Sequence, residues 1–296
     1  MIFLLIKFYK LMIKVFNYFI QSIVIYIVLL SAKILGIKYS RVIFSSIFSK
    51  IGPFFKSNKI IEKNLNIYKK NISEEEKKKI ISCMWRNYGM TFIEYVFLNI
   101  FKKENNHVII KGEKYLKNII QTKKPVIFIS GHFANFELMS MEIVKKNIPL
   151  ATIYRPLNNF FLNPLMEYLR RKYVCKNQIK KGVSGVREAI EYLKKGHSIA
   201  LMVDQRVSEG EKIDFFGEQA LTTTLPAQLS LKFDLSIIPV FIERNEKDNF
   251  KIKFYDQIDA KNFNNKSDLT KRLNKSVEEM IAHKPENWIW THNRWK

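Results

Sequence analysis

The stretch from Val126 to Met139 constrains the fold of this chain more than any other. It opens with β-branched and aromatic residues, at positions 125–129, which are typical of a buried strand. A Ser-Gly pair ends that run. From about Asn135, a candidate helix cap, apolar residues recur at helical spacing. His132 and Glu137 are therefore expected where a strand ends and a helix begins, and open α/β sheets usually place their sites there.

His132 and Glu137 can act together only if the chain bends between them. In one continuous helix, side chains five residues apart point roughly 140° away from each other. With His132 in the loop and Glu137 in the first helical turns, the carboxylate could fix the imidazole tautomer while the free ring nitrogen takes a proton from an alcohol. The alternative is a partly buried histidine near an exposed glutamate. A zinc site is disfavoured because the chain has no H-E-x-x-H motif.

Polar residues also follow two other apolar runs that read as strands. Arg155 comes directly after residues 150–154, and Asp204 and Gln205 come directly after residues 198–203. Because parallel strands end at the same edge of a sheet, these side chains are candidates for the same site as His132.

A small basic loop at residues 180–185 contains another candidate, Gly182. We expect this loop to open a helix from Val186 to Lys195, and backbone amides at a helix start suit an anion. A plain turn is the alternative. Further strands are expected at 107–110, 237–243 and 250–255, a hairpin-like excursion at 212–217, and helices at 58–72, 158–173, 222–232 and 268–283. The sequence Ser73-Glu-Glu-Glu76 is a capping box, and it predicts a helix that continues to about Tyr95.

The composition sets the broad class of protein. With 296 residues and 47% hydrophobic residues, the chain can build a sizeable core but is not apolar enough for a polytopic membrane protein. The two cysteines, Cys83 and Cys175, stand far apart, so neither a disulfide framework nor a zinc ribbon is indicated, and a reducing compartment is the default. The formal charge of +23 favours partners that are polyanions: nucleic acid, anionic lipid or an acidic protein.

The N-terminal region carries its own signal, because residues 1–61 contain no Asp or Glu. Within it, Val15 to Ala32 is an uncharged run of 18 residues with basic residues on both sides. That run is long enough to span a bilayer. It could also be a cleaved signal peptide, a helix lying in the membrane interface, or a soluble core helix. The basic flanks favour attachment to a cytoplasmic leaflet, either spanning or lying flat. The aromatic and basic tail, residues 285–296, could pack on the body or face lipid.

Together these stretches resemble the late acyltransferases of lipid A biosynthesis, the lauroyl and myristoyl transferases of the glycerolipid acyltransferase-like superfamily. The resemblance covers nearly the whole chain and rests on five motifs in this order: Gly131-His132-x-x-x-x-Glu137, Tyr154-Arg155-Pro156-Leu157, Asp204-Gln205, Phe215-Phe216-Gly217 and Pro285-Glu286-x-Trp288-x-Trp290-x-His292-x-Arg294-Trp295-Lys296.

The resemblance implies an α/β fold with a mixed, mostly parallel central sheet flanked by helices, and an N-terminal membrane-associated helix. Residues 1–35 would form the anchor and residues 36–296 the acyltransferase domain. It further implies transfer of an acyl chain from acyl carrier protein to a hydroxyl of a Kdo-bearing lipid A precursor. His132 would be the general base and Glu137 its charge partner. Arg155 would hold the oxyanion or a substrate phosphate.

Further expectations follow from the same resemblance. Asp204 and Gln205 would support the site or touch substrate, and Asn135 would contact substrate or only cap the helix. No metal, cofactor or nucleic acid is expected, and the enzyme would be a monomer on the cytoplasmic face of a bacterial inner membrane, single-pass or peripheral. The rival readings are an acyltransferase for another acceptor (lysophospholipid, glycerol phosphate or a glycolipid) and a non-catalytic protein that binds anionic lipid.

Overall fold

The computed structural model describes residues 2–55, 58–104 and 106–296. At its centre lies a seven-stranded sheet in the order β1-β9-β8-β2-β5-β3-β4, in which only the pair β8–β9 is antiparallel. Its strands are β1 (Val108–Lys111), β2 (Ile127–Ser130), β3 (Leu150–Tyr154), β4 (Asn177–Lys180), β5 (Ser198–Met202), β8 (Ile237–Arg244) and β9 (Phe250–Phe254). The expected mixed, mostly parallel sheet is confirmed. A separate hairpin joins β6 (Glu211–Phe215) to β7 (Glu218–Thr222).

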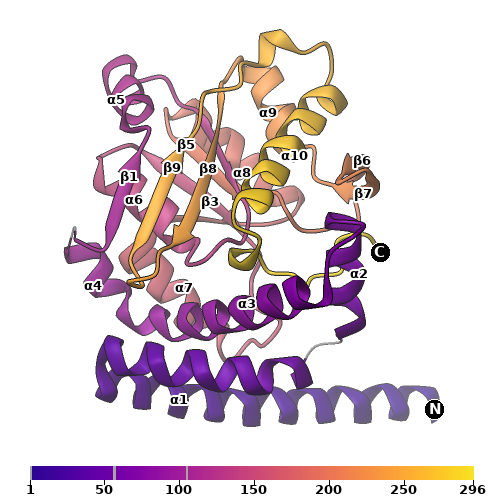
Figure 1. Ribbon diagram of the computed structural model, residues 1–296. Coiled ribbons are helices and arrows are strands. Elements are labelled where there is room, and N and C mark those ends of the chain that lie inside the picture. Colours follow the sequence, from indigo (N-terminus) through magenta and orange to yellow (C-terminus); the bar gives the residue numbers. More distant parts are fainter. Residues whose placement is uncertain (1, 56–57, 105) are drawn as a thin grey trace.

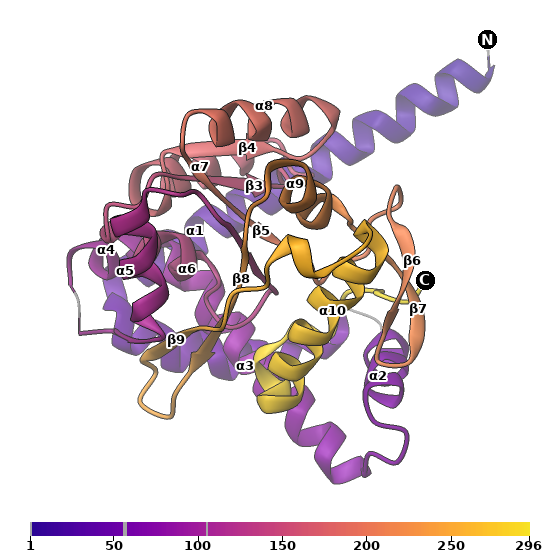
Figure 2. The same ribbon diagram turned by 90° about the horizontal axis from the view of Figure 1, so that it is seen from above.

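Helices cover both faces of this sheet, and α1 and α3 form a layer below its edge (Figures 1 and 2). The α-helices are α1 (Ile2–Phe55), α2 (Asn58–Tyr68), α3 (Glu74–Glu94), α4 (Leu98–Lys103), α5 (Glu113–Thr122), α6 (Glu137–Lys145), α7 (Asn163–Leu169), α8 (Val183–Lys194), α9 (Leu225–Phe233) and α10 (Lys266–His283). Short helical turns are η1 (Tyr95–Phe97), η2 (Arg170–Val174), η3 (Ala260–Asn262) and η4 (Pro285–Asn287).

Strand β2 shows why the fold has a hydrophobic core on each face of the sheet. All four of its residues are buried. Because side chains alternate along a strand, Ile127 and Ile129 join one core while Phe128 joins the other. A strand buried on both faces reads as an unbroken apolar run, which is the pattern found in the sequence.

Several local expectations are borne out and others are corrected. The Ser73 hydroxyl caps α3 by accepting from the Glu76 amide at 3.1 Å. Asn135 does not cap α6 with its side chain, because that helix begins only at Glu137. Helix α8 starts at Val183, earlier than expected. Strand β4 was not predicted, because its sequence, Asn-Gln-Ile-Lys, alternates too weakly to stand out.

Helix α1 consists of two arms. Gly36 breaks the helix with φ 74° and ψ 164°, a backbone conformation that glycine adopts without strain. The second arm turns back and runs beneath α3 (Figure 1). Residues along the inner side, including Leu29, Ala32 and Phe44, are buried against the body.

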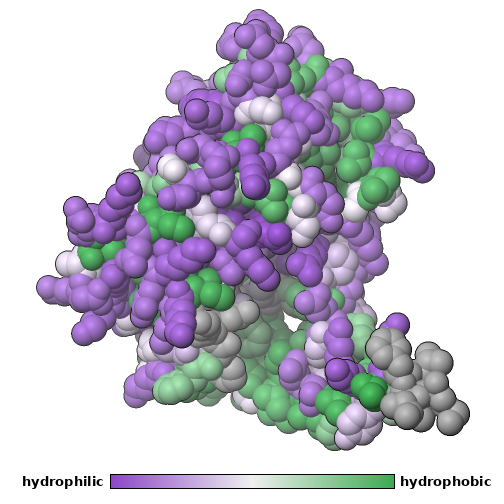
Figure 3. Space-filling model, turned by 90° about the vertical axis from the view of Figure 1, so that its right-hand side faces the viewer, coloured by the Kyte–Doolittle hydropathy of each residue, from purple (hydrophilic) through white to green (hydrophobic). Residues whose placement is uncertain are grey.

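The outer side of α1 is apolar and exposed. Among the described residues, the stretch Ile6–Phe54, which Gly36 divides into two arms, is long and apolar enough to cross a membrane, and few of its side chains are buried. Figure 3 shows apolar side chains gathered along the lower part of the molecule, where α1 lies. This surface is far larger than the scattered apolar residues that soluble proteins tolerate.

Candidate active site

His132 lies two residues after the end of β2, and Asp204 lies two residues after the end of the neighbouring strand β5. The His132 amide donates to Asp204 Oδ2 at 2.9 Å, and His132 Nδ1 lies 2.8 Å from Asp204 Oδ1. The imidazole is partly exposed, whereas the carboxylate is buried. Gly131 permits this close approach, because a Cβ there would lie 2.7 Å from the Phe133 ring and 3.3 Å from Asp204 Cβ.

The surroundings of Asp204 keep it ionised. Burial on its own would raise the pKa of this carboxyl, but the His132 ring and hydrogen bonds from His132 and Trp288 lower it to about 2. Trp288 Nε1 donates to Asp204 Oδ2 at 2.8 Å. An ionised carboxylate at Nδ1 holds the proton of a neutral imidazole there, so the lone pair of Nε2 is left to accept a proton. This is the chemistry of a general base with an orienting carboxylate.

Glu137 does not occupy the expected place beside the His132 ring. Its Oε1 accepts from the Tyr95 hydroxyl at 2.8 Å and pairs with Arg170 at 2.7 Å. The ring of Phe136 packs against His132 instead, with centroids 4.8 Å apart. The expected loop does bend the chain, but it turns Glu137 toward η2. The prediction that Glu137 orients the imidazole is therefore corrected, because Asp204 holds the ring.

Asn135 is tied into a buried ionic network and is not free to contact a ligand with its amide nitrogen. Its Nδ2 donates to Glu94 Oε2 at 2.9 Å. Glu94 is fully buried and also pairs with Arg41 at 2.7 Å and Arg244 at 2.6 Å. Burial would raise the pKa of Glu94, but the two guanidiniums lower it. The network joins α1, α3 and β8 to the loop that carries His132.

The other predicted site residues lie at the same edge of the sheet. In the order β2-β5-β3-β4, Gln205 follows β5, Arg155 follows β3 and Gly182 follows β4. Arg155 is exposed and donates to Asn158 Oδ1 at 3.3 Å. Gln205 is half-buried next to Asp204, and Gly182 is exposed ahead of α8. The structure thus gathers these loops along one edge but joins only Asp204 to His132.

The C-terminal segment packs on the body and reaches the site, a role that the sequence left open. Trp288 forms an antiparallel bridge with Phe133, and the Ala134 amide donates to the Asn287 carbonyl at 3.0 Å. Nearby, His292 Nε2 accepts from the Arg206 amide at 2.9 Å. The aromatic and basic tail motif is the only sequence signal that pointed to these contacts. Tyr95, Arg170 and Glu94 gave no signal of their own.

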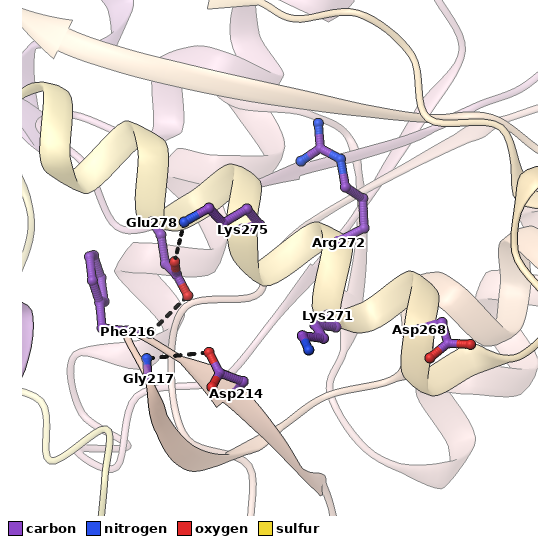
Figure 4. Close-up of a pocket in the computed structure, with 8 residues that line it drawn as sticks. All are labelled: Asp214, Phe216, Gly217, Asp268, Lys271, Arg272, Lys275 and Glu278. Atoms are coloured by element: carbon purple, nitrogen blue, oxygen red, sulfur yellow. Dashed lines mark hydrogen bonds and ion pairs between the residues drawn. The ribbon is translucent and has the colours of Figure 1, made fainter.

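Two cavities adjoin the turn between β6 and β7, and neither is lined by His132. The larger one, about 690 Å³, lies between this turn and α10 (Figure 4). Some of its charged side chains already have partners: Glu278 accepts from the Phe216 amide and pairs with Lys275, and Asp214 accepts from the Gly217 amide. Among the described residues, no group of three or more His, Cys, Asp or Glu side chains could hold a metal ion.

Comparisons with known proteins place the chain in a family. The sequence model of the bacterial lipid A biosynthesis acyltransferases matches residues 7–296. The chain is 24% identical over 254 residues to the lipid A biosynthesis palmitoleoyltransferase of Escherichia coli, covering 82% of this chain and 80% of that protein. It is 22% identical over 245 residues to the lauroyltransferase of the same organism, covering 80% and 78%.

A lipid A biosynthesis acyltransferase of Haemophilus influenzae is 23% identical over 264 residues, covering 86% of this chain and 82% of that protein. Among solved structures, the 1-acyl-sn-glycerophosphate acyltransferase of Thermotoga maritima aligns with a TM-score of 0.43 and 15% identity, over 86% of this chain and all of the other. With the family match spanning nearly every residue, the chain belongs to the bacterial lipid A biosynthesis acyltransferase family.

Proposed function

We propose that this acyltransferase moves a fatty acyl group from acyl carrier protein to a hydroxyl of a Kdo-bearing lipid A precursor, with His132 as the general base. The observation that supports this most is the hydrogen bond between His132 Nδ1 and the buried carboxylate of Asp204. It leaves Nε2 of a partly exposed ring available to accept a proton from a substrate hydroxyl. Lipid alcohols are poor nucleophiles near neutral pH, so transfer from a thioester needs such a base.

In the proposed step, the acceptor hydroxyl gives its proton to His132 Nε2 as its oxygen attacks the thioester carbonyl. The tetrahedral intermediate then collapses, the carbon–sulfur bond breaks, and the imidazolium returns the proton to the departing thiolate. Asp204 stabilises the imidazolium between these two events. Arg155 binds the oxyanion or a phosphate of the lipid. The products are the ester and the free carrier thiol.

Glu137 then has a supporting role. Its pairing with Arg170 and Tyr95 fixes the start of α6 and so the far end of the loop that carries His132. Asn135 fixes the same loop through Glu94. We assign Gln205 and Gly182 to the lining of the substrate-binding edge, on the basis of their place after β5 and β4.

The apolar outer side of α1 supports attachment to the cytoplasmic face of a bacterial inner membrane. The formal charge of +23 fits both of the proposed anionic substrates, acyl carrier protein and the phosphorylated lipid.

To test this, membranes that contain the protein are incubated with the Kdo-bearing precursor and a panel of acyl carrier protein thioesters. The mass of the lipid product is then measured. Added acyl mass on the precursor, absent with His132→Ala, is the expected result. Transfer to glycerol phosphate or lysophospholipid instead would move the activity to another acceptor. No transfer to any acceptor would favour a non-catalytic lipid-binding protein.

A further inference from the structure

The loop between β3 and α7, residues 155–162, exposes apolar side chains next to α1. Phe160 is 52% exposed and Leu157 is 39% exposed, and Tyr168 on the following helix is 53% exposed. All three belong to the segment that follows β3, at the edge of the sheet where the candidate site lies. Large apolar side chains exposed next to another apolar surface, here that of α1, are typical of a contact surface.

This loop is held firmly against α1. Asn159 is buried, and its Nδ2 donates to the Tyr18 carbonyl at 2.9 Å while its Oδ1 accepts from the Ser22 hydroxyl at 3.0 Å. The Tyr26 hydroxyl donates to the Phe161 carbonyl at 2.9 Å. These polar contacts make the loop and the first arm of α1 one continuous surface.

Aromatic rings extend that junction outward. Tyr18 and Phe160 meet edge to face with centroids 6.2 Å apart, and Phe19 and Phe161 do so at 5.5 Å. Phe160 thus continues the exposed apolar side of α1, whose own exposed residues here include Phe16, Phe19, Ile20 and Ile23.

The charges around this surface fit an anionic bilayer. Lys7, Lys10 and Lys14 recur at spacings of three and four, so they lie on one face of the helix, and residues 1–61 contain no acid. Basic residues beside a large apolar surface favour binding to a bilayer with anionic headgroups. An acidic protein partner would satisfy the lysines but not the apolar area.

We propose that the loop 155–162 inserts into the membrane interface beside α1. This proposal does not depend on the proposed function, because it rests on the exposed side chain of Phe160, on the contacts of the loop with α1 and on the basic residues of that helix.

The insertion is tested with an environment-sensitive fluorophore on Phe160→Cys, in full-length protein carrying Cys83→Ser and Cys175→Ala. Ile120→Cys is the matched control, because Ile120 is 46% exposed on α5, which lies on the opposite side of the molecule from α1 (Figure 1). With vesicles of phosphatidylethanolamine and phosphatidylglycerol, we expect a blue-shifted, brighter signal at 160, quenched by brominated lipid, and none at 120. The proposal is overturned if the fluorophores at both positions report the same exposure to water. It is also overturned if the fluorophore at 160 is shielded when the protein self-associates, without vesicles.

If the protein fails to acylate lipid A precursor at all, the proposed function falls, while the fluorescence result at position 160 still decides the insertion.

Discussion

Replacing Asp204 by Asn tests the pairing at the candidate site, because it removes one charge and leaves the shape of the side chain unchanged. The buried carboxylate touches His132 through two hydrogen bonds and Trp288 through a third. An asparagine can donate its amide hydrogen to His132 Nδ1. That would move the ring proton to Nε2 and remove the lone pair that a general base needs.

The expected magnitude follows from the pKa of Asp204. Its fall from the ordinary 3.8 to about 2 corresponds to about 2 kcal/mol in favour of the charged form, at about 1.36 kcal/mol per pKa unit. Because the carboxylate and the imidazolium stabilise each other, losing the carboxylate should lower kcat roughly 10- to 100-fold, and the exchanged tautomer extends the loss toward about 10⁴-fold. KM for the acyl donor should stay within a few-fold, because no substrate contact is removed.

The assay compares initial rates of acyl transfer for Asp204→Asn and Glu137→Gln at saturating donor. Glu137→Gln is the matched control, because it also removes one carboxylate charge but leaves the contacts of His132 with Asp204 in place. We expect Asp204→Asn to lose far more kcat. The reverse order, with Asp204→Asn within about threefold of the unaltered enzyme, would refute the assignment and return Glu137 to the position of charge partner.

Three further outcomes follow from the same contacts. Trp288→Phe removes a hydrogen bond to the charged Asp204, which is worth about 1.5–3 kcal/mol. We expect this variant to have a lower kcat and an altered pH profile of kcat/KM, whereas the control Trp290→Phe should have an unchanged pH profile. Glu94→Gln leaves two guanidiniums buried without their carboxylate and should lower the free energy of unfolding by about 3–5 kcal/mol in urea titrations. Because the pKa of Asp204 is depressed in the folded state, its contribution of about 2 kcal/mol is present above pH 4 and is lost as pH falls through about 2. The free energy of unfolding should therefore drop less steeply over that range for Asp204→Asn, and an identical slope would contradict this.

Much of the fold could be predicted because its strands are short apolar runs with clear ends. Strand β3 was expected and found at 150–154, and β5 at 198–203 appears as Ser198–Met202. The return of α1 at Gly36 could not be foreseen. A single glycine within an apolar run does not indicate a positive φ, and helices tolerate isolated glycines.

The site was predicted in part for a related reason. The sequence placed His132 and Asp204 at strand ends, but their contact depends on β2 lying next to β5, and strand order is not encoded in local spacing. A carboxylate five residues from His132 looked like the natural partner, whereas one 72 residues away did not. The tail motif was visible, but only the packed structure shows Trp288 against Asp204.

The most direct test of the account is the initial rate of acyl transfer to a Kdo-bearing lipid A precursor by His132→Ala, measured by lipid mass against the unaltered protein at equal membrane content. We expect a loss of about 10²–10⁴-fold, the range that a general base contributes. A rate within a few-fold of the unaltered protein would contradict the claim that this imidazole removes the proton of the acceptor hydroxyl.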